Sequence, residues 1–468
     1  MAMRGIWSDA DTLVAAGLPA RDVKEWERAW PRKTGSFAVD RRTFGPYWQK
    51  SARLLGQLPP KARRSAREDI SARLIQGAAI DARERFLRAH ADAVYDALTA
   101  RRTKFVRLER LMVEAAKLVP GLTPSPKEIA AEDGLLQGEK AGLEIDQGTL
   151  LSAWLRSAQS GRHLCHAMLL AREDSTDLLP KFMKEDRAEF PGASIERRGK
   201  AAIVTYKNPR FLNAEDQTTL DGMEICVDLA LLDARVEVAV LRGGVVEHPK
   251  YAGRRVFGSG INLTHLYHGR IPYLWYQQRD IGYVNKLYRG LALYDAPPDE
   301  FGGKTLEKPW IAVVESFAIG GHCQVLLAVD YVLAEKGAYL TLPARKEGII
   351  PGAANMRLPR AVGDRIARQA IQYERRIECD SPEGRMICDE IVEPGTMDAA
   401  IERVVDGLTN SGVVSAASNR RAFRITQEPL DMFRNYFAVY AREQAYCHFS
   451  PALISNLERY WNAQNRKP

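Results

Sequence analysis

Short β-type runs alternate with helical stretches through the middle of this 468-residue chain. The β-type runs span residues 201–206, 236–241, 310–314 and 330–334, and helical patterns lie near 215–233, 273–295 and 322–329. Strands that alternate with helices are typical of parallel pairing, because each parallel connection needs a crossover. The sequence therefore predicts an α/β core from residue 195 to residue 395.

The residues before this core have the pattern of helices. One helix face repeats at Leu87, Ala91, Val94 and Leu98. Residues 125–128, Ser-Pro-Lys-Glu, combine a cap, a first-turn proline and an early acid, which predict a new helix start. We expect an all-helical N-terminal domain over 1–194, ending near Pro191-Gly192, and a C-terminal helical segment over 396–468.

The charge pattern bears on partners. The net charge is +8, but basic residues are interleaved with acidic ones and form no Lys/Arg block, so we expect no nucleic-acid partner. The sequence has no run of about 18 apolar residues, so no membrane partner is expected. The N-terminus lacks the apolar stretch of a signal peptide, which makes the cytoplasm the expected location.

The cysteines and histidines do not predict a metal site. The six cysteines include no CxxC pair and are expected to be free thiols. His163, Cys165 and His166 lie close together on a predicted helix, but a zinc site needs four ligands, usually in two grouped pairs. The sequence offers no second pair, so we expect no bound metal.

Two glycine-containing segments follow strands of the predicted core. The first is Gly258-Ser259-Gly260-Ile261-Asn262-Leu263, and the second is Ile319-Gly320-Gly321-His322-Cys323-Gln324, which opens a helix. Glycine lets backbone approach a ligand closely, and the first N–H groups of a helix have no intrahelical partner. Two such N–H groups aimed at one carbonyl oxygen would form an oxyanion hole. Taken singly, each segment is also compatible with a turn that only packs a strand against a helix.

A third segment makes the pattern more specific. It runs Gly348-Ile349-Ile350-Pro351-Gly352-Ala353-Ala354-Asn355, and the opening strand continues as Lys207-Asn208-Pro209. In this order and spacing, residues 196–395 resemble the crotonase (enoyl-CoA hydratase/isomerase) superfamily. The resemblance implies a ββα spiral core, an acyl-CoA substrate, and a homo-oligomer that is a trimer or a dimer of trimers. It also implies that the backbone N–H groups of Ile261 and Gly321 form the oxyanion hole.

Two positions depart from the hydratases of this superfamily. Hydratases carry a glutamate three residues after the second oxyanion glycine and another seven residues before the proline of the Pro-Gly signature. Here these positions are Gln324 and Ala344. Because both carboxylates are absent, we do not expect water addition to an enoyl double bond. The hole would still stabilise an enolate.

The segment from Gly258 to Tyr267, the Arg279-Asp280 pair and the long helical N-terminal part resemble a dioxygenase branch of the superfamily. That resemblance implies an arylacetyl-CoA substrate, O₂ as co-substrate, and no metal or organic cofactor. It implies a catalytic role for Glu215 in proton transfer or hydroxyl binding, and substrate-binding roles for Arg279 and Gln324. It further implies an apolar oxygen pocket formed by Ile261, Leu263, Ile349 and Ile350.

Other interpretations stay open for the sequence alone. Glu215 also suits the start of a helix, where a carboxylate complements the dipole, and Arg279 also suits a solvated surface. For His322, packing at the helix start is favoured over a role as a base. The chain could instead be another acyl-CoA enzyme, such as a thioester hydrolase or decarboxylase, or a non-catalytic acyl-CoA-binding protein.

Overall fold

A computed structural model describes residues 9–301, 304–410 and 413–468. The chain forms two compact units. The first, unit 1, extends to Leu164 and includes Phe437–Pro451, and the second, unit 2, comprises Cys165–Tyr436 and Ala452–Pro468. The predicted order of helices, α/β core and further helices is confirmed, while the exact domain ranges 1–194, 195–395 and 396–468 stay a prediction.

Unit 1 is helical, as expected for the N-terminal part. Its helices are α1 (Ala10–Ala15), α2 (Ala20–Arg28), α3 (Phe37–Leu55), α4 (Ala66–Leu98), α5 (Leu108–Leu118), α6 (Pro126–Ala130) and α7 (Ile145–Arg156). Helix α8 (Ala158–Leu169) follows them along the chain. The predicted helix start at Ser125 is confirmed, because the Ser125 side chain accepts from the Glu128 N–H while Glu128 accepts from the Ser125 N–H.

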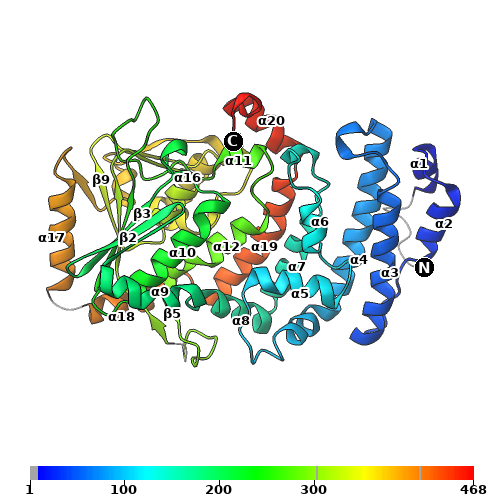
Figure 1. The fold of residues 1–468 in the computed structure, drawn as a ribbon, viewed down its shortest axis with the longest axis horizontal. Coiled ribbons are helices and arrows are strands. Elements are labelled where there is room, and N and C mark those ends of the chain that lie inside the picture. Colours follow the sequence, from blue (N-terminus) through cyan, green and yellow to red (C-terminus); the bar gives the residue numbers. More distant parts are fainter. Residues whose placement is uncertain (1–8, 302–303, 411–412) are drawn as a thin grey trace. The chain divides into compact units, whose positions relative to one another are not determined.

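Unit 2 contains every strand of the described chain (Figure 1). The strands are β1 (Arg187–Phe190), β2 (Ala193–Arg198), β3 (Ala201–Tyr206), β4 (Val238–Gly243), β5 (Leu291–Ala292), β6 (Thr305–Leu306), β7 (Trp310–Val314), β8 (Phe317–Ile319), β9 (Tyr331–Glu335), β10 (Tyr339–Thr341), β11 (Ile377–Glu378) and β12 (Glu390–Val392). The four predicted strands correspond to β3, β4, β7 and β9 and are confirmed.

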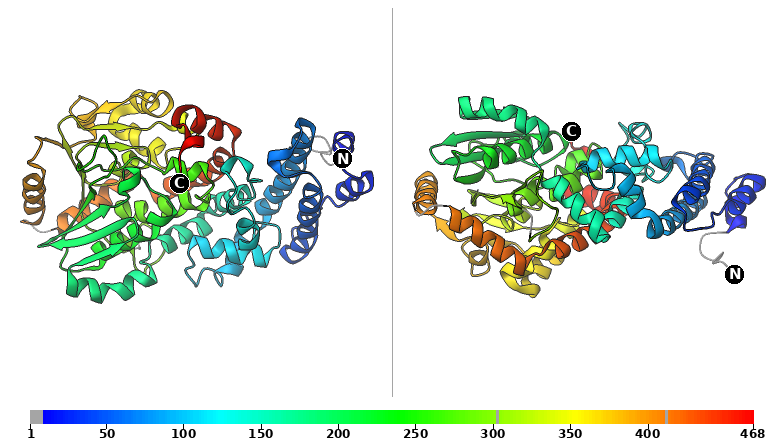
Figure 2. Two further views of the ribbon diagram at one scale, coloured as in Figure 1. Left: turned by 45° about the horizontal axis from the view of Figure 1, so that its top comes forward. Right: turned by 90° about the horizontal axis from the view of Figure 1, so that it is seen from below.

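Further helices precede, connect or follow these strands along the chain, and the helix at Leu430–His448 continues into unit 1 from Phe437. These helices are α9 (Glu173–Glu185), α10 (Gln217–Leu232), α11 (Leu263–Tyr267), α12 (Leu274–Ile281), α13 (Tyr283–Arg289), α14 (Gly321–Leu326), α15 (Ala344–Glu347), α16 (Ala354–Tyr373), α17 (Met397–Thr409), α18 (Val414–Gln427), α19 (Leu430–His448) and α20 (Pro451–Trp461). Helix α10 packs along β2 and β3 and beside α9, as the turned views also show (Figure 2).

The described strands form three sheets. The large sheet has the order β1-β2-β3-β4-β7-β9-β12, and its strands from β3 to β12 run parallel. A small sheet has the order β11-β10-β8, with β8 and β10 parallel, and β5 pairs with β6. The parallel core expected from strand–helix alternation is therefore present.

The hairpin β1–β2 differs from the sequence expectation. Residues 187–190 were expected to be helical, but they form an antiparallel edge strand that pairs with β2. Pro191-Gly192, where a domain boundary was expected, is the turn of this hairpin, and Gly192 has a φ of +74°. The turn lies against α10, since a Cβ atom on Gly192 would come within 2.5 Å of the Thr219 Cα.

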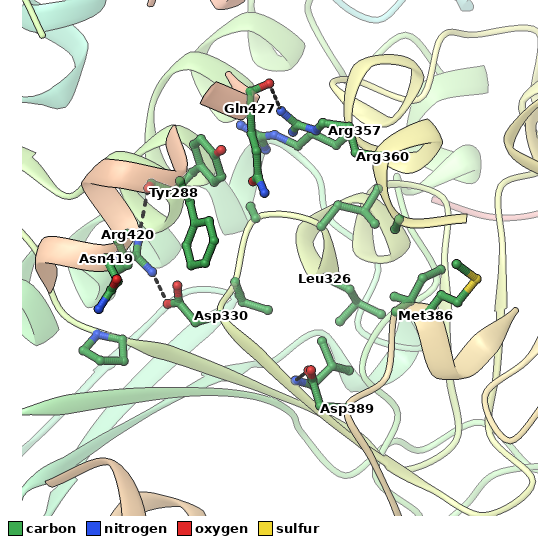
Figure 3. Close-up of a pocket in the computed structure, with 18 of the residues that line it drawn as sticks. Tyr288, Leu326, Asp330, Arg357, Arg360, Met386, Asp389, Asn419, Arg420 and Gln427 are labelled. Atoms are coloured by element: carbon green, nitrogen blue, oxygen red, sulfur yellow. Dashed lines mark hydrogen bonds and ion pairs between the residues drawn. The ribbon is translucent and has the colours of Figure 1, made fainter. Parts of the chain in front are cut away.

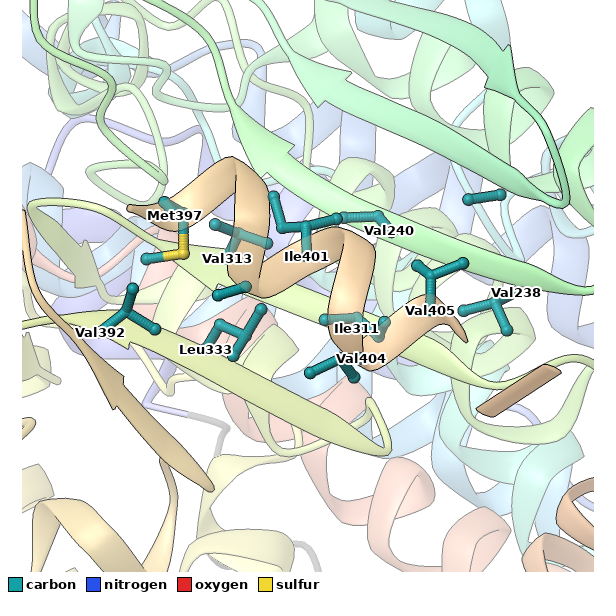
Figure 4. Packing of buried hydrophobic residues seen from close by; sticks show 12 residues of the cluster. Val238, Val240, Ile311, Val313, Leu333, Val392, Met397, Ile401, Val404 and Val405 are labelled. Atoms are coloured by element: carbon teal, nitrogen blue, oxygen red, sulfur yellow. The ribbon is translucent and has the colours of Figure 1, made fainter. Parts of the chain in front are cut away.

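Helix α17 covers one face of the large sheet (Figure 4). Its buried side chains recur at helical spacing and are Met397, Ala400, Ile401, Val404 and Val405. They pack on side chains from the central strands, namely Val238, Val240, Ile311, Val313 and Leu333. This core fixes the strands whose ends carry the glycine-containing segments.

This packing predicts the effect of trimming α17. Ile401→Ala removes buried methyl groups against the sheet and should lower the free energy of unfolding by about 2–4 kcal/mol, measured by urea denaturation. Glu402→Ala, on the exposed side of the same helix, should change it by less than about 0.5 kcal/mol. Equal losses for the two variants would contradict the packing described.

Candidate active site

The two glycine-containing segments lie side by side. Gly258 and Ala318 form a parallel bridge, in which the Ile319 N–H donates to the Gly258 carbonyl at 3.0 Å. Gly260 has a φ of +82°, and a Cβ atom there would lie 3.0 Å from the Ile319 oxygen and 3.3 Å from the Gly321 nitrogen. Only glycine meets both conditions, and the residues after Gly260 and Gly320 are thereby brought together.

The backbone pairing directs the two predicted donors away from the surrounding backbone. The Glu215 N–H donates to the Gly260 oxygen and the Asn262 N–H donates to the Glu215 oxygen, each at 2.8 Å. In this parallel bridge the N–H of Ile261 points away from Glu215. Gly321 opens α14, where an N–H has no intrahelical acceptor. Within the described ranges, neither N–H group has a hydrogen-bond partner.

A buried ion pair supports the turn at Gly321. Glu215 is 2% exposed and Arg279 is 1% exposed. Arg279 Nε donates to Glu215 Oε2 at 2.9 Å, and Arg279 Nη2 donates to the same oxygen at 2.7 Å. Arg279 Nη2 also donates to the Gly321 carbonyl at 2.9 Å, and the Tyr283 hydroxyl donates to Glu215. The structure thus brings together Glu215, Arg279 and Gly321.

Both members of this pair are ionised. Burial acts to raise the pKa of Glu215, but the Arg279 charge and its hydrogen bonds outweigh burial and lower that pKa below its ordinary value. Burial acts to lower the pKa of Arg279, but the Glu215 charge raises it well above its ordinary value. Glu215 is therefore a buried carboxylate with three donors, and Arg279 is not a solvated charge.

His322 holds the first segment in place. The Gly260 N–H donates to His322 Nδ1 at 3.0 Å, and burial lowers the pKa of His322 to about 4. The ring is therefore neutral at pH 7, with its proton on Nε2. A Cβ atom on Gly258 would come within 2.3 Å of the ring. This geometry fits the packing role favoured from the sequence. The one ring nitrogen of His322 that could accept a proton, Nδ1, already accepts the Gly260 N–H.

Gln324 contacts the third segment. Its Oε1 accepts the Ala353 N–H at 3.1 Å. Gly352 has a φ of +46°, and a Cβ atom there would lie 2.0 Å from Gln324 Oε1 and 2.6 Å from Asp280 Oδ2. The Pro-Gly signature therefore lies against α14 and the end of α12, so the three segments quoted for the family resemblance meet in space.

The predicted apolar wall comes from two parts of unit 2. Ile261 and Leu263 lie at the start of α11, while Ile349 and Ile350 lie between α15 and α16. Ile261 and Ile349 are buried, and Leu263 and Ile350 are half-buried. Their role as an oxygen pocket stays a prediction.

Sequence reasoning missed one ionisable residue beside the predicted oxyanion turn. Glu347 is 6% exposed, and a Cβ atom on Gly320 would lie 3.6 Å from Glu347 Oε1. The spacing in the sequence could have indicated it, because Ala344 and Glu347 are three residues apart and therefore share one face of a helix. In the structure this face of α15 is buried, while Arg345 and Lys346 between the two residues are exposed.

A separate cavity of about 470 Å³ lies elsewhere in unit 2 (Figure 3). Leu326, Asp330 and Phe423 are among the residues that line it. Its basic residues are already paired, since Arg357 binds Glu428 and Arg420 binds Asp330. None of the predicted site residues lines this cavity, so we do not assign the site to it.

Residues 9–301, 304–410 and 413–468 contain no group of three or more His, Cys, Asp or Glu side chains arranged to hold a metal ion. The same ranges contain no helix of the length and apolar character that a bilayer crossing requires.

The ion pair predicts how stability responds when one partner is removed. Arg279→Met leaves Glu215 as a buried, uncompensated charge, which should lower the free energy of unfolding by about 3–5 kcal/mol. Adding Glu215→Gln to that variant removes the charge and should recover most of the loss. Urea denaturation of the two variants measures this difference. Equal instability of the single and double variants would show that the pair is not compensating a buried charge.

Comparisons with known proteins agree with this geometry. The Enoyl-CoA hydratase/isomerase family model matches residues 196–424. A (3,5-dihydroxyphenyl)acetyl-CoA 1,2-dioxygenase from Amycolatopsis orientalis is 44% identical over 418 residues, which are 89% of this chain and 94% of that protein. A short-chain-enoyl-CoA hydratase from Clostridium acetobutylicum is 27% identical, over 50% of this chain and 81% of that protein.

Among solved structures, an enoyl-CoA hydratase from Mycobacterium avium subsp. paratuberculosis K-10 is similar with a TM-score of 0.47 and 20% identity. That match covers 60% of this chain and 98% of the other. The family model and the identity to the Amycolatopsis protein over nearly its whole length decide the assignment. The chain belongs to the crotonase (enoyl-CoA hydratase/isomerase) superfamily, as its three backbone segments predict.

Proposed function

We propose that this protein is a dioxygenase that converts 3,5-dihydroxyphenylacetyl-CoA and O₂ to 3,5-dihydroxyphenylglyoxylate and free CoA. The observation that carries the proposal is the 44% identity to the Amycolatopsis dioxygenase over 89% of this chain. That match extends well beyond residues 196–424, which the family model covers, so it includes much of the helical N-terminal part. The match to the Clostridium acetobutylicum hydratase covers 50% of this chain.

The site chemistry supports the same proposal. The Ile261 and Gly321 N–H groups lie on adjacent segments without protein acceptors among the described residues. Gln324 and Ala344 occupy the two positions at which hydratases carry glutamates. A hole without these acids suits a reaction that passes through an enolate and does not add water to a double bond.

The proposed reaction balances without an added cofactor. Loss of an α-proton leaves an electron pair shared by the α-carbon, the thioester oxygen and the aryl ring. This carbanion transfers one electron to O₂, and the two radicals combine to form a C–O bond and a peroxide. The peroxide attacks the thioester carbonyl, the C–S bond breaks and CoA leaves. Loss of the second α-proton then breaks the O–O bond, so both oxygen atoms end in the arylglyoxylate.

The predicted roles of the site residues are part of this proposal. The Ile261 and Gly321 N–H groups hold the thioester oxygen. Glu215 serves proton transfer or hydroxyl binding, while Arg279 and Gln324 serve substrate binding. Ile261, Leu263, Ile349 and Ile350 provide a dry pocket for O₂. We also propose a cytoplasmic homo-oligomer, a trimer or a dimer of trimers, that uses no metal or organic cofactor.

The direct test incubates metal-stripped protein with 3,5-dihydroxyphenylacetyl-CoA and follows O₂ uptake and CoA release together. We expect one O₂ consumed for each CoA released, and two labelled oxygen atoms in the glyoxylate when ¹⁸O₂ is supplied. CoA release that continues under argon would instead indicate a thioester hydrolase or a decarboxylase. Binding of the thioester without any turnover would indicate a non-catalytic protein.

The oxyanion hole has its own prediction. Gly321→Pro removes the N–H at the first position of α14, where proline is otherwise well tolerated, and should lower kcat/KM by about 100- to 1,000-fold. Gly321→Ala is the matched control, because it adds a Cβ atom at the same place, 3.2 Å from Arg279 Nη2, and keeps the N–H. If both variants lose the same activity, crowding and not the N–H explains the loss.

A further inference from the structure

Glu347 is a buried acid at the end of α15, the four-residue helix Ala344–Glu347. Its two neighbours in that helix are exposed and bind another residue. Arg345 Nη2 lies 3.1 Å from Glu374 Oε1, and Lys346 Nζ lies 2.5 Å from Glu374 Oε2. Glu347 instead lies on the inner side of the helix, and its carboxyl group has no hydrogen-bond or ion-pair partner within the described residues.

The inner side of α15 faces the oxyanion turn. A Cβ atom on Gly320 would lie 3.6 Å from Glu347 Oε1 and 3.8 Å from Glu347 Oε2, and also 3.6 Å from the Gly260 Cα. Gly320 and Gly260 are the residues that immediately precede the two oxyanion donors. The carboxyl group of Glu347 therefore borders the hole at the point where both donor segments meet.

The surroundings of Glu347 bring the pKa of its carboxyl group close to neutral pH. Burial, together with the nearby Glu374 carboxylate, raises the pKa of Glu347 to about 7. The charged groups next to it are Glu374, the residue that follows α16, and the Arg345 and Lys346 side chains that bind Glu374. From α20, Leu453 and Asn456 approach Gly348, and neither can titrate. A carboxyl group that ionises near neutral pH is well matched to proton transfer at that pH.

We propose that Glu347 is the general base that removes the α-proton of the bound thioester. This inference rests on the proposed function and deepens it. The α-carbon is bonded to the carbonyl carbon whose oxygen occupies the hole, so a base at the edge of the hole is placed to reach it. In the step, the C–H bond breaks, the proton bonds to a Glu347 oxygen, and the electron pair moves toward the oxygen held by Ile261 and Gly321.

The other polar groups of the site are less suited to this step. Glu215 already accepts from Arg279 and Tyr283, so its lone pairs are engaged. His322 accepts the Gly260 N–H through Nδ1. Gln324 is an amide and has no basic atom at neutral pH. Asp280 accepts from Arg279 Nη1 at 2.8 Å. Among the carboxyl groups of the site in the described residues, Glu347 is therefore the one best able to accept a proton.

The test separates proton removal from oxygen chemistry. The full-length protein is incubated with 3,5-dihydroxyphenylacetyl-CoA in D₂O under argon, and deuterium entry at the α-carbon is followed by mass spectrometry. We expect Glu347→Gln to lower the enzyme-catalysed exchange rate at least about 100-fold, and Glu347→Asp to restore part of it. Binding of the thioester should change little. A folded Glu347→Gln protein that exchanges at the wild-type rate would overturn the proposal. If Glu215→Gln loses the exchange activity while Glu347→Gln keeps it, the base is Glu215.

The pH dependence of exchange distinguishes a base from a structural residue, and the melting temperature checks the raised pKa of Glu347 independently. Glu374→Gln removes the neighbouring negative charge and should lower the pKa of Glu347. In a plot of exchange rate against pH, the acid limb should therefore move to lower pH, while the maximal rate stays unchanged. Because an acid with a raised pKa in the folded state loses stability as pH rises from its unfolded pKa toward 7, Glu347→Gln should melt at a higher temperature than wild type at pH 8. An unmoved acid limb would overturn the proposal even if Glu347→Gln did not fold.

The proposed function can fail independently. Wild-type protein that exchanges the α-proton under argon but consumes no O₂ in air would refute the dioxygenase and leave the base assignment in place. Wild-type activity in air, combined with full exchange in Glu347→Gln, would refute only the assignment of Glu347.

Discussion

The buried pair of Glu215 and Arg279 links the two segments that carry the predicted oxyanion donors, Ile261 and Gly321. The backbone of Glu215 pairs with the segment that carries Ile261. The side chain of Glu215 binds Arg279, which in turn donates to the Gly321 carbonyl at 2.9 Å. A buried ion pair offsets the cost of removing its charges from water only when its geometry is good and its remaining atoms are hydrogen-bonded. The position of both N–H donors therefore depends on this one contact being complete.

The backbone of the site could be predicted from sequence because its constraints are local. Glycine occupies the positions where two backbone segments approach closely or where φ is positive, namely Gly258, Gly260 and Gly352. A Cβ atom at each of these positions would come within 3.0 Å of other atoms. The glycines in the sequence therefore indicate these close approaches directly. The four central strands are buried runs of apolar residues and gave equally clear signals. The edge strand β1 could not be recognised in this way, because Arg187 and Glu189 are exposed and its four residues include no apolar run.

The side-chain partnerships could not be predicted in the same way. Glu215 and Arg279 are 64 positions apart, and either residue alone is compatible with a solvated surface. His322 was favoured as a packing residue, but its hydrogen bond to the Gly260 N–H depends on the bridge between two separate segments. Glu347 was missed because comparison with hydratases draws attention to Gln324 and Ala344, the positions where an acid is absent.

The small sheet explains how an acid can lie beside the predicted oxyanion turn from a different position in the sequence. The Gly320 N–H donates to the Thr341 oxygen of β10 at 2.9 Å, and β10 leads directly into α15. This bond fixes the start of α15 relative to the oxyanion turn. Ala344 and Glu347 are both buried and three residues apart in that helix, which is close to one helical turn. A carboxyl group moved from the first position to the second therefore stays on the inner side of α15, and it still faces the turn at Gly320.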